Sequence, residues 1–168
     1  MKFDRTPAFA ALGFSCCLCA IPWQPAFAQA AAPYSWRNAA IGGGGYITGI
    51  EYHPRQPGLS YVRTDVGGAY RRDRPDGPWI ALNDAIGGID NQFMRLGVLS
   101  LALDPSDANQ VYLACGQYDA PWAPPAVFMA SADRGATWTE TPLPFKLGGN
   151  QNGRGTGERL AVDPSDGA

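Results

Sequence analysis

The chain has 168 residues and a formal net charge of −2 at pH 7, and only 17% of its residues are charged. Arginine and aspartate are scattered singly rather than in blocks, so the surface has no electrostatic footprint for nucleic acid or for anionic membranes. This charge distribution is better suited to a neutral partner. With 21 glycines and 15 prolines, the composition is typical of short strands and tight turns rather than of helices.

Residues 1–28 have the pattern of an export signal. Lys2 and Arg5 precede an apolar stretch from Ala8 to Ile21, and the small-x-small triplet Ala26–Ala28 follows. The apolar stretch is shorter than the roughly 20 residues that a membrane-spanning helix needs. We expect cleavage after Ala28, with Ala30 as the alternative, a short linker over 29–33, and a secreted or periplasmic protein without membrane attachment.

Cleavage at this site removes three of the four cysteines and leaves Cys115. Lipidation of Cys16, Cys17 or Cys19 is disfavoured, because no leucine stands three positions before any of them. The mature chain therefore contains no internal disulfide. Cys115 follows an apolar strand-like run, and this position favours a buried cysteine over a nucleophile.

A short strand-like phrase that ends in proline occurs three times, at Gly49–Pro54, Leu101–Pro105 and Leu160–Pro164. The interval of about fifty to sixty residues is that of a propeller blade and not of a helical solenoid. Proline cannot donate to a strand ladder, so it marks the end of each first strand. A second alternating strand follows in the first two copies, at Leu59–Val62 and Val111–Ala114. The repeats predict an all-β propeller, here an incomplete part with two blades and the beginning of a third.

The second unit contains a match to the Asp-box pattern Ser/Thr-x-Asp-x-Gly-x-Thr-Trp, the mark of BNR-like repeats. The aspartate and the hydroxyls can bond the backbone of their own turn, the glycine allows a positive φ, and the tryptophan can bury its ring beside the blade. We expect this turn to be structural and to have no catalytic role. Its defining residues are Ser131, Asp133, Gly135, Thr137 and Trp138.

The segment Arg63–Tyr70 of the first unit has an aspartate, a glycine and an aromatic residue in the same three places. We interpret it as a degraded Asp box, in which Arg63 and Ala69 replace the two hydroxyl residues. The local bracing is then weaker, and Asp65 is released for another task. The alternative is a structural box that has merely diverged.

Several motifs resemble glycoside hydrolase family 74. Tyr34–Asn38, Ile41–Tyr46 and Arg63–Arg71 resemble the opening of that family's sequences, and Leu143–Asn150 and Gly153–Pro164 are similar to its first propeller. The resemblance implies two seven-bladed propellers with a substrate cleft between them, and residues 34–168 would supply the N-terminal part of the first. It implies endo-β-1,4-glucanase-type hydrolysis of plant cell-wall xyloglucan with inversion.

The resemblance also implies a catalytic role for Asp65, which matches the catalytic aspartate of the family's first propeller. An inverting glycosidase uses two carboxyl groups about 6.5–9.5 Å apart, one to donate a proton and one to activate water. We expect Asp65 to be the general base. The resemblance puts the partner acid in the second propeller, beyond these residues.

Glucan rings stack on aromatic side chains, so Trp122 in the insertion Tyr118–Pro125 is a candidate subsite residue. A structural tryptophan that covers a blade end is the alternative, and Trp79 is expected in the core. The glycine-rich segment Gly148–Gly157 lacks the context of a phosphate-binding loop. We interpret it as a cleft-lining loop, for which the candidate substrate contacts are Asn150, Arg154 and Glu158; a structural pairing of Glu158 with Arg159 is the alternative.

Two further functions remain open at this point: a noncatalytic Asp-box propeller that binds glycan or protein, as sortilin-like domains do, and a sialidase-like propeller. The flanking motifs favour the glycosidase over both. No metal or other cofactor is implied, because His53 has no neighbouring histidine or cysteine set, and it occupies a turn position of the repeat.

Overall fold

The computed structural model of the chain describes residues 35, 38–86 and 92–165. The chain divides into residues 1–37 and residues 38–168, and the strands found in the described residues lie in the second unit. The predicted signal peptide (1–28) and linker (29–33) lie outside the described residues, as does Tyr34.

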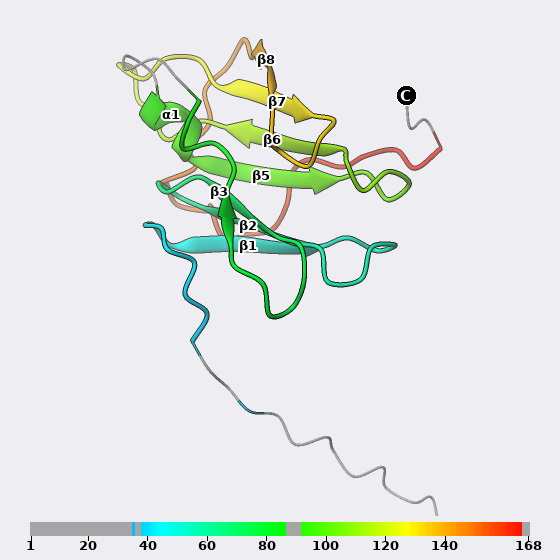
Figure 1. The fold of residues 1–168 in the computed structure, drawn as a ribbon. Helices are drawn as coiled ribbons and strands as arrows, with labels where there is room; N and C mark the ends of the chain where they lie inside the picture. The colour runs from blue at the N-terminus through cyan, green and yellow to red at the C-terminus, as the bar shows by residue number, and fades with distance from the viewer. Residues whose placement is uncertain (1–34, 36–37, 87–91, 166–168) are drawn as a thin grey trace, which may run out of the picture. The chain divides into compact units, whose positions relative to one another are not determined.

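The second unit contains two four-stranded antiparallel sheets, each a meander in which neighbours along the chain are neighbours in the sheet (Figure 1). We call the first sheet blade 1 and the second blade 2. Both have the strand number and order of a propeller blade, as the repeats predicted. Blade 1 consists of β1 (Ile47–Tyr52), β2 (Ser60–Thr64), β3 (Ala69–Arg72) and β4 (Ile80–Ala81), and blade 2 of β5 (Val98–Leu103), β6 (Val111–Cys115), β7 (Val127–Ser131) and β8 (Thr139–Pro142).

The two blades also share their register. The β1–β2 pairing shifts between Ile47 and Gly49, and the β5–β6 pairing shifts at the same place, between Val98 and Ser100. The first strands end before the predicted prolines, at Tyr52 and Leu103. A short helix, α1 (Gln92–Leu96), precedes β5 and has no signature in the sequence periodicity.

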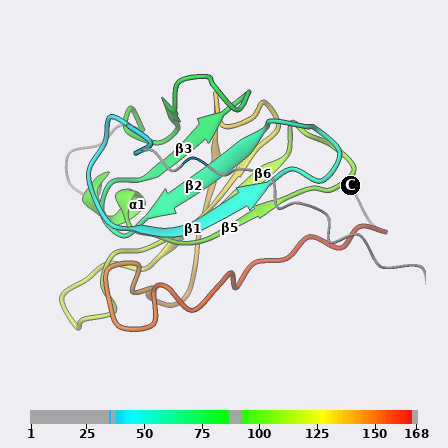
Figure 2. The same ribbon diagram turned by 90° about the horizontal axis from the view of Figure 1, so that it is seen from below.

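The hydrophobic core lies where the two blades pack together, and in both ribbon views β1 and β5 run side by side (Figures 1 and 2). A valine, leucine or methionine side chain stabilises the fold by about 1.5–3 kcal/mol when it is fully buried. Strand β2 is buried at all five positions, so its sequence alternation does not mark an exposed face. The core residues are Leu59, Tyr61, Ala69 and Leu82 of blade 1 and Val98, Leu101, Val111, Leu113, Cys115 and Met129 of blade 2.

Polar contacts join the blades around this core. His53 Nδ1 accepts from the Arg55 backbone, so the Nε2 hydrogen is available to the Asp104 carbonyl at 2.9 Å. Trp138 Nε1 of blade 2 donates to the Leu82 carbonyl of blade 1 at 3.1 Å. These bonds satisfy polar groups that the packing would otherwise leave unpaired, which is the usual condition for burying them.

The Asp box forms the turn between β7 and β8. Ser131 Oγ donates to Asp133 Oδ1 at 2.7 Å, and Thr137 donates to the same carboxylate through its hydroxyl at 2.6 Å and its amide at 2.8 Å. The bonds from Thr137, followed by that from Ser131, lower the pKa of Asp133 to about 2. Arg134 and Gly135 have positive φ values of 60° and 86°, so the turn is tight.

The interpretation of Arg63–Tyr70 as a degraded Asp box is wrong. This segment joins the second and third strands of blade 1, whereas the Asp box joins the third and fourth strands of blade 2. The strand registers instead place Trp79 where Trp138 stands and Arg74 where Asp133 stands. The two segments look alike because tight hairpin turns favour the same residue types.

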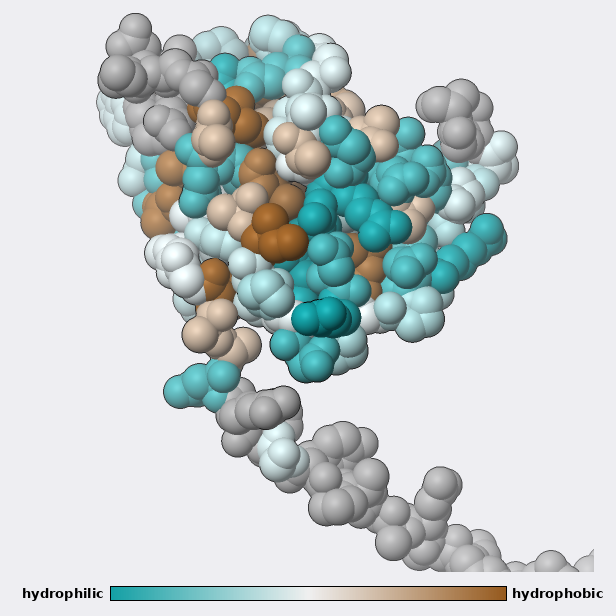
Figure 3. Space-filling view, viewed as in Figure 1, coloured by the Kyte–Doolittle hydropathy of each residue, from teal (hydrophilic) through white to brown (hydrophobic). Residues whose placement is uncertain are grey.

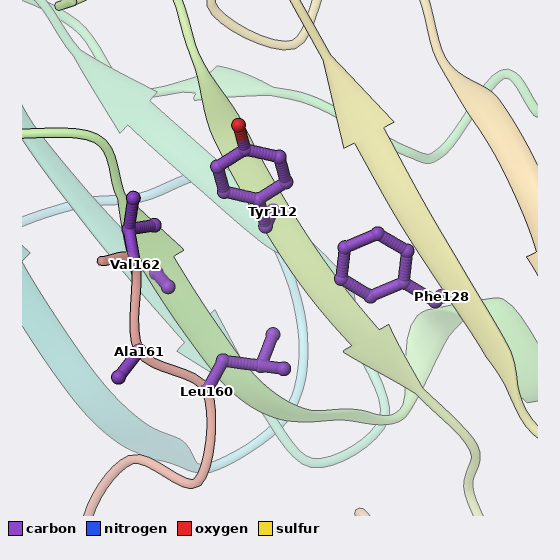
Figure 4. Close-up of a pocket in the computed structure, with 6 residues that line it drawn as sticks. Tyr112, Phe128, Leu160, Ala161 and Val162 are labelled. Atoms are coloured by element: carbon purple, nitrogen blue, oxygen red, sulfur yellow. The ribbon is translucent and has the colours of Figure 1, made fainter. Parts of the chain in front are cut away.

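The third copy of the repeated phrase forms no strand. Residues Leu160–Val162 are extended and lie against blade 2, where they line a pocket with Ala102, Tyr112 and Phe128 (Figure 4). The Tyr112 and Phe128 rings stack 5.9 Å apart on the opposite wall. An extended segment becomes a strand only when a neighbouring backbone pairs with it, and within the described residues this segment has no such partner.

Candidate functional site

Asp65 stands at the start of the tight turn between β2 and β3. The Thr64 hydroxyl donates to the Gly68 carbonyl at 2.9 Å and accepts from the Gly67 amide at 2.8 Å, so the turn is braced by the residue next to Asp65. Asp65 itself is only 6% exposed. Its carboxylate is therefore held by protein groups rather than by bulk water.

The glycine-rich run before β1 supplies the first of these groups. The Tyr46 amide donates to Asp65 Oδ1 at 2.7 Å, and the Asp65 amide donates back to the Tyr46 carbonyl at 3.2 Å. Gly45 has a φ of 93°, and a Cβ on Gly67 would overlap the Gly44 carbonyl oxygen. Glycine is thus required at Gly45 for its positive φ and at Gly67 because a side chain there would push the run away from Asp65.

A guanidinium group faces the other oxygen of the carboxylate. Arg154 Nε lies 3.2 Å from Asp65 Oδ2, and Arg154 Cζ lies 5.8 Å from the centre of the Tyr46 ring. The Tyr46 ring is 65% exposed. The Asp65 carboxylate is compensated in charge by Arg154 and is bordered by an accessible aromatic face.

Arg154 belongs to a segment that we call the crossing loop, residues 148–159, because it contacts both blades. Near its start the Gly149 and Asn150 amides donate to the carbonyls of Gly116 and Gln117, which follow β6 of blade 2. Further along, Arg154 reaches Asp65 of blade 1. In Figure 2 this loop, in orange, lies at the same end of the blades as the β6–β7 connection.

Glu158, at the end of the crossing loop, accepts three bonds from protein groups. Arg63 Nε of β2 lies 2.5 Å from Oε1, and the Ser100 hydroxyl and the Leu101 amide of β5 donate to Oε2 at 2.8 and 2.6 Å. The alternative, a structural pairing of Glu158 with Arg159, is not what the structure has, because the Arg159 guanidinium bonds Gly153 and Thr156 of its own loop. The structure gives Glu158 a bracing role; a direct contact with substrate stays a prediction.

Trp122, Tyr118 and Asn150 come together beside the long β6–β7 connection. The Trp122 and Tyr118 rings are 5.3 Å apart, and Asn150 Nδ2 donates to the Tyr118 hydroxyl at 2.8 Å. Lys146 Nζ donates to the carbonyls of Ala120 and Pro121 and fixes the loop. Trp122 is 66% exposed, and its contact with substrate stays a prediction.

Trp79, which we expected in the core, lies outside it. It is half-buried beside β4, and the Arg72 guanidinium lies 4.7 Å from its ring centre. Trp79 is equivalent in position to Trp138, because each directly precedes the fourth strand of its blade.

The site residue that the sequence reasoning missed is Arg63. Its side chain is fully buried in β2, where it bonds the crossing loop and the Val98 carbonyl. A charged residue inside an otherwise uncharged strand is a usable signal, since buried charges need partners. Burial raises the pKa of the nearby Glu51 carboxyl, the negative charge of Glu158 raises it further, and Arg63 opposes both.

Across residues 38–86 and 92–165, no three histidine, cysteine, aspartate or glutamate side chains gather as metal ligands would. None of the helices in the described part of the chain has the length and apolarity needed to cross a membrane. Figure 3 shows hydrophobic and hydrophilic side chains interspersed over one face of the molecule.

The chain is similar in sequence to several named proteins. No protein-family profile matches the chain. A xyloglucanase from Hypocrea jecorina is 49% identical over 138 residues, which cover 80% of this chain and 16% of the relative. An oligoxyloglucan-reducing end-specific xyloglucanase from Emericella nidulans is 48% identical over 131 residues, or 78% of this chain and 16% of the relative.

A solved structure agrees with these sequences. The crystal structure of a glycoside hydrolase family 74 xyloglucanase from Xanthomonas campestris superposes with a TM-score of 0.70 at 52% identity, over 80% of this chain and 19% of that one. A family 74 enzyme from Niastella koreensis gives a TM-score of 0.65 at 44% identity, over 76% and 18%.

The two meandering blades with a shared core define part of a β-propeller protein. Within that class, the chain belongs to glycoside hydrolase family 74. It spans about a sixth of the length of the curated relatives that it matches. The sortilin-like and sialidase-like assignments that an Asp box alone leaves open give way to this one.

Proposed function

We propose that these residues belong to a secreted glycosidase that hydrolyses the β-1,4-glucan backbone of xyloglucan with inversion, and that Asp65 is its general base. The observation that carries this proposal is the arrangement around Asp65, whose Oδ1 is held by the Tyr46 amide and whose Oδ2 faces Arg154. The xyloglucanase names of the relatives support the substrate class.

The proposed reaction assigns each proton. Asp65 takes a proton from water, the water oxygen forms a bond to the anomeric carbon, and the glycosidic carbon–oxygen bond breaks on the opposite side. A second carboxylic acid protonates the leaving oxygen, and we propose that it comes from a part of the full-length protein beyond these residues. A base fixed in this way contributes about 10²- to 10⁴-fold to the rate.

Binding of the polymer is proposed at the same end of the blades. The exposed Trp122 ring offers a flat apolar face for a sugar ring, and Asn150 and Arg154 offer polar groups beside it. These groups recognise a neutral, hydroxyl-rich ligand without a cluster of like charges. Residues 1–28 are proposed to direct export, so that the secreted protein begins at Gln29; mass spectrometry of its N-terminus tests this.

The experiment for the proposed reaction uses the full-length gene product that contains these residues, with xyloglucan as substrate. Proton NMR of the first-formed reducing ends should show the α-anomer, which later equilibrates. An Asp65→Ala variant should be inactive on its own and should regain turnover when azide is added, because azide replaces the activated water. Wild-type enzyme with azide is the control. A first-formed β-anomer, or an Asp65→Ala variant that hydrolyses at the wild-type rate, would overturn the proposal.

A further inference from the structure

The Arg63 guanidinium reaches from β2 of blade 1 into the crossing loop. Besides Nε on Glu158, NH1 donates to the Arg154 carbonyl at 3.1 Å and NH2 to the Gly157 carbonyl at 3.2 Å. NH1 also donates to Thr48 Oγ1 at 2.7 Å. One planar group with donors in a fixed fork thus fixes three points of the loop at once, which a lysine ammonium cannot do.

The other half of the pair is anchored on blade 2. Glu158 Oε2 accepts from Ser100 and Leu101 of β5, while Oε1 faces Arg63. The lack of a side chain at Gly49 makes room for both charged groups, because a Cβ there would lie 2.5 Å from Glu158 Oε1 and 2.7 Å from Arg63 Nε. The ion pair therefore connects blade 1, the crossing loop and blade 2 inside the protein.

We propose that Arg63 and Glu158 are positioning residues that set where Arg154 stands against Asp65. This inference depends on the proposed role of Asp65. Arg63 lies on β2, two residues before Asp65 in the turn that follows, and it bonds the backbone of Arg154 directly. The buried Arg63 side chain therefore helps to position both partners of the Arg154–Asp65 contact. A shift of the Arg63–Glu158 pair then displaces Arg154 from the Asp65 carboxylate.

A purely structural ion pair in the same fold provides the matched control. Arg95 Nε and NH2 donate to Glu140 Oε1 and Oε2 at 2.8 and 2.6 Å, and the side chains are 18% and 26% exposed. Glu140 is on β8, the outermost strand of blade 2, and within the described residues its carboxylate bonds Arg95 rather than the crossing loop or Asp65. Loss of this pair should weaken the fold without touching the reaction.

The test compares Glu158→Gln with Glu140→Gln in the full-length gene product. Each change replaces one carboxylate oxygen by an amide nitrogen that faces hydrogen-bond donors. We expect Glu158→Gln to lower kcat about 10- to 100-fold, the effect of a misplacement near 1 Å or less, with KM within about twofold. We expect Glu140→Gln to lower the melting temperature by about as much as Glu158→Gln does, and to leave kcat unchanged. Equal kcat values for folded Glu158→Gln and wild type would overturn the inference.

A double-mutant cycle shows whether the effect passes through Arg154. In an Arg154→Ala background, Glu158→Gln should cause no further loss of kcat, because the group that it positions is already gone. Additive losses from the two changes would contradict a positioning role and would leave Glu158 as a general structural residue.

A milder variant covers the case in which Glu158→Gln does not fold. Ser100→Ala removes one donor to Glu158 and the acceptor of the Arg159 and Leu160 amides, but it keeps the Arg63–Glu158 pair. It should lower kcat severalfold with KM unchanged, and an unchanged kcat would overturn the inference. Asp65→Asn is measured alongside: if that variant is active, the proposed function fails, whereas an inactive Asp65→Asn with a fully active Ser100→Ala removes only the positioning role.

Discussion

In blade 1 the second hairpin is a tight turn that holds Asp65 beside the glycine-rich run, whereas in blade 2 the same hairpin is a long loop that carries Trp122. The third hairpins of the two blades differ as well. Blade 2 has the hydrogen-bonded Asp box, and blade 1 has an arginine in place of Asp133. Two sheets with the same register thus carry different side chains on equivalent turns.

Successive hairpins of a meander lie at opposite ends of its strands. The second hairpins therefore gather Asp65, the crossing loop and Trp122 at one end of the blades, and the third hairpins place the Asp box at the other. Groups proposed for binding and catalysis are separated from groups that brace the sheet. Mutations in the two sets should then change different measurements.

The largest effect on folding is expected from Gly67→Ala in the Asp65 turn. The new Cβ would overlap the Gly44 carbonyl oxygen, and two backbones must move apart, at a cost of about 1–3 kcal/mol or more. Gly155→Ala in the crossing loop is the control, because no atom lies within 4 Å of its added Cβ. Thermal melting should show a large loss for the first variant and little change for the second, and equal melting temperatures would refute the close contact.

A pair of tryptophan variants should separate stability from binding. Trp138→Phe removes the bond to the Leu82 carbonyl, at a cost of about 1 kcal/mol, and lowers the melting temperature by a few degrees. Trp122→Ala should leave the melting temperature unchanged, since the ring is mostly exposed, and should raise KM for xyloglucan about three- to tenfold. A stability loss for Trp122→Ala without a change in KM would instead make it the structural residue.

The smallest effect is expected in the acid stability of the Asp box. The pKa of Asp133 is lowered to about 2, against about 3.9 in an unfolded chain, so its stabilisation is present above pH 4 and lost as the pH falls to about 2. Melting temperatures of Asp133→Asn should depend less on pH across this window than those of wild type. Parallel pH dependences would show that the turn does not hold its carboxylate in the charged form.

The sequence was sufficient to predict the blades and the family. It was not sufficient to show which turn of blade 1 corresponds to the Asp box of blade 2. Proline after each first strand and the repeat interval are local signals, and they indicated where strands end. Asp65 and Asp133 stand in similar phrases on different hairpins, because a phrase of this kind reports a tight turn and not which strands it joins. Counting from the shared strand phrases would have avoided the error.

Long-range pairs were beyond prediction for a different reason. Arg63 and Glu158 are 95 residues apart, and nothing in either local segment specifies the other. Leu160–Val162 has the composition of a strand, yet strand formation depends on a backbone partner that composition does not provide. Trp79 was expected in the core from its apolar surroundings, but its place at a hairpin end leaves it half-buried under Arg72.

The central claim is that the two look-alike aspartates have separate roles, and one paired measurement tests it. Asp65→Asn and Asp133→Asn are made in the full-length gene product, and kcat on xyloglucan and the melting temperature are measured for both. We predict that Asp65→Asn stays folded and loses at least about 100-fold in kcat, while Asp133→Asn melts earlier and keeps its kcat where it is folded. A folded Asp65→Asn variant with wild-type kcat, or a folded Asp133→Asn variant without activity, would contradict this account.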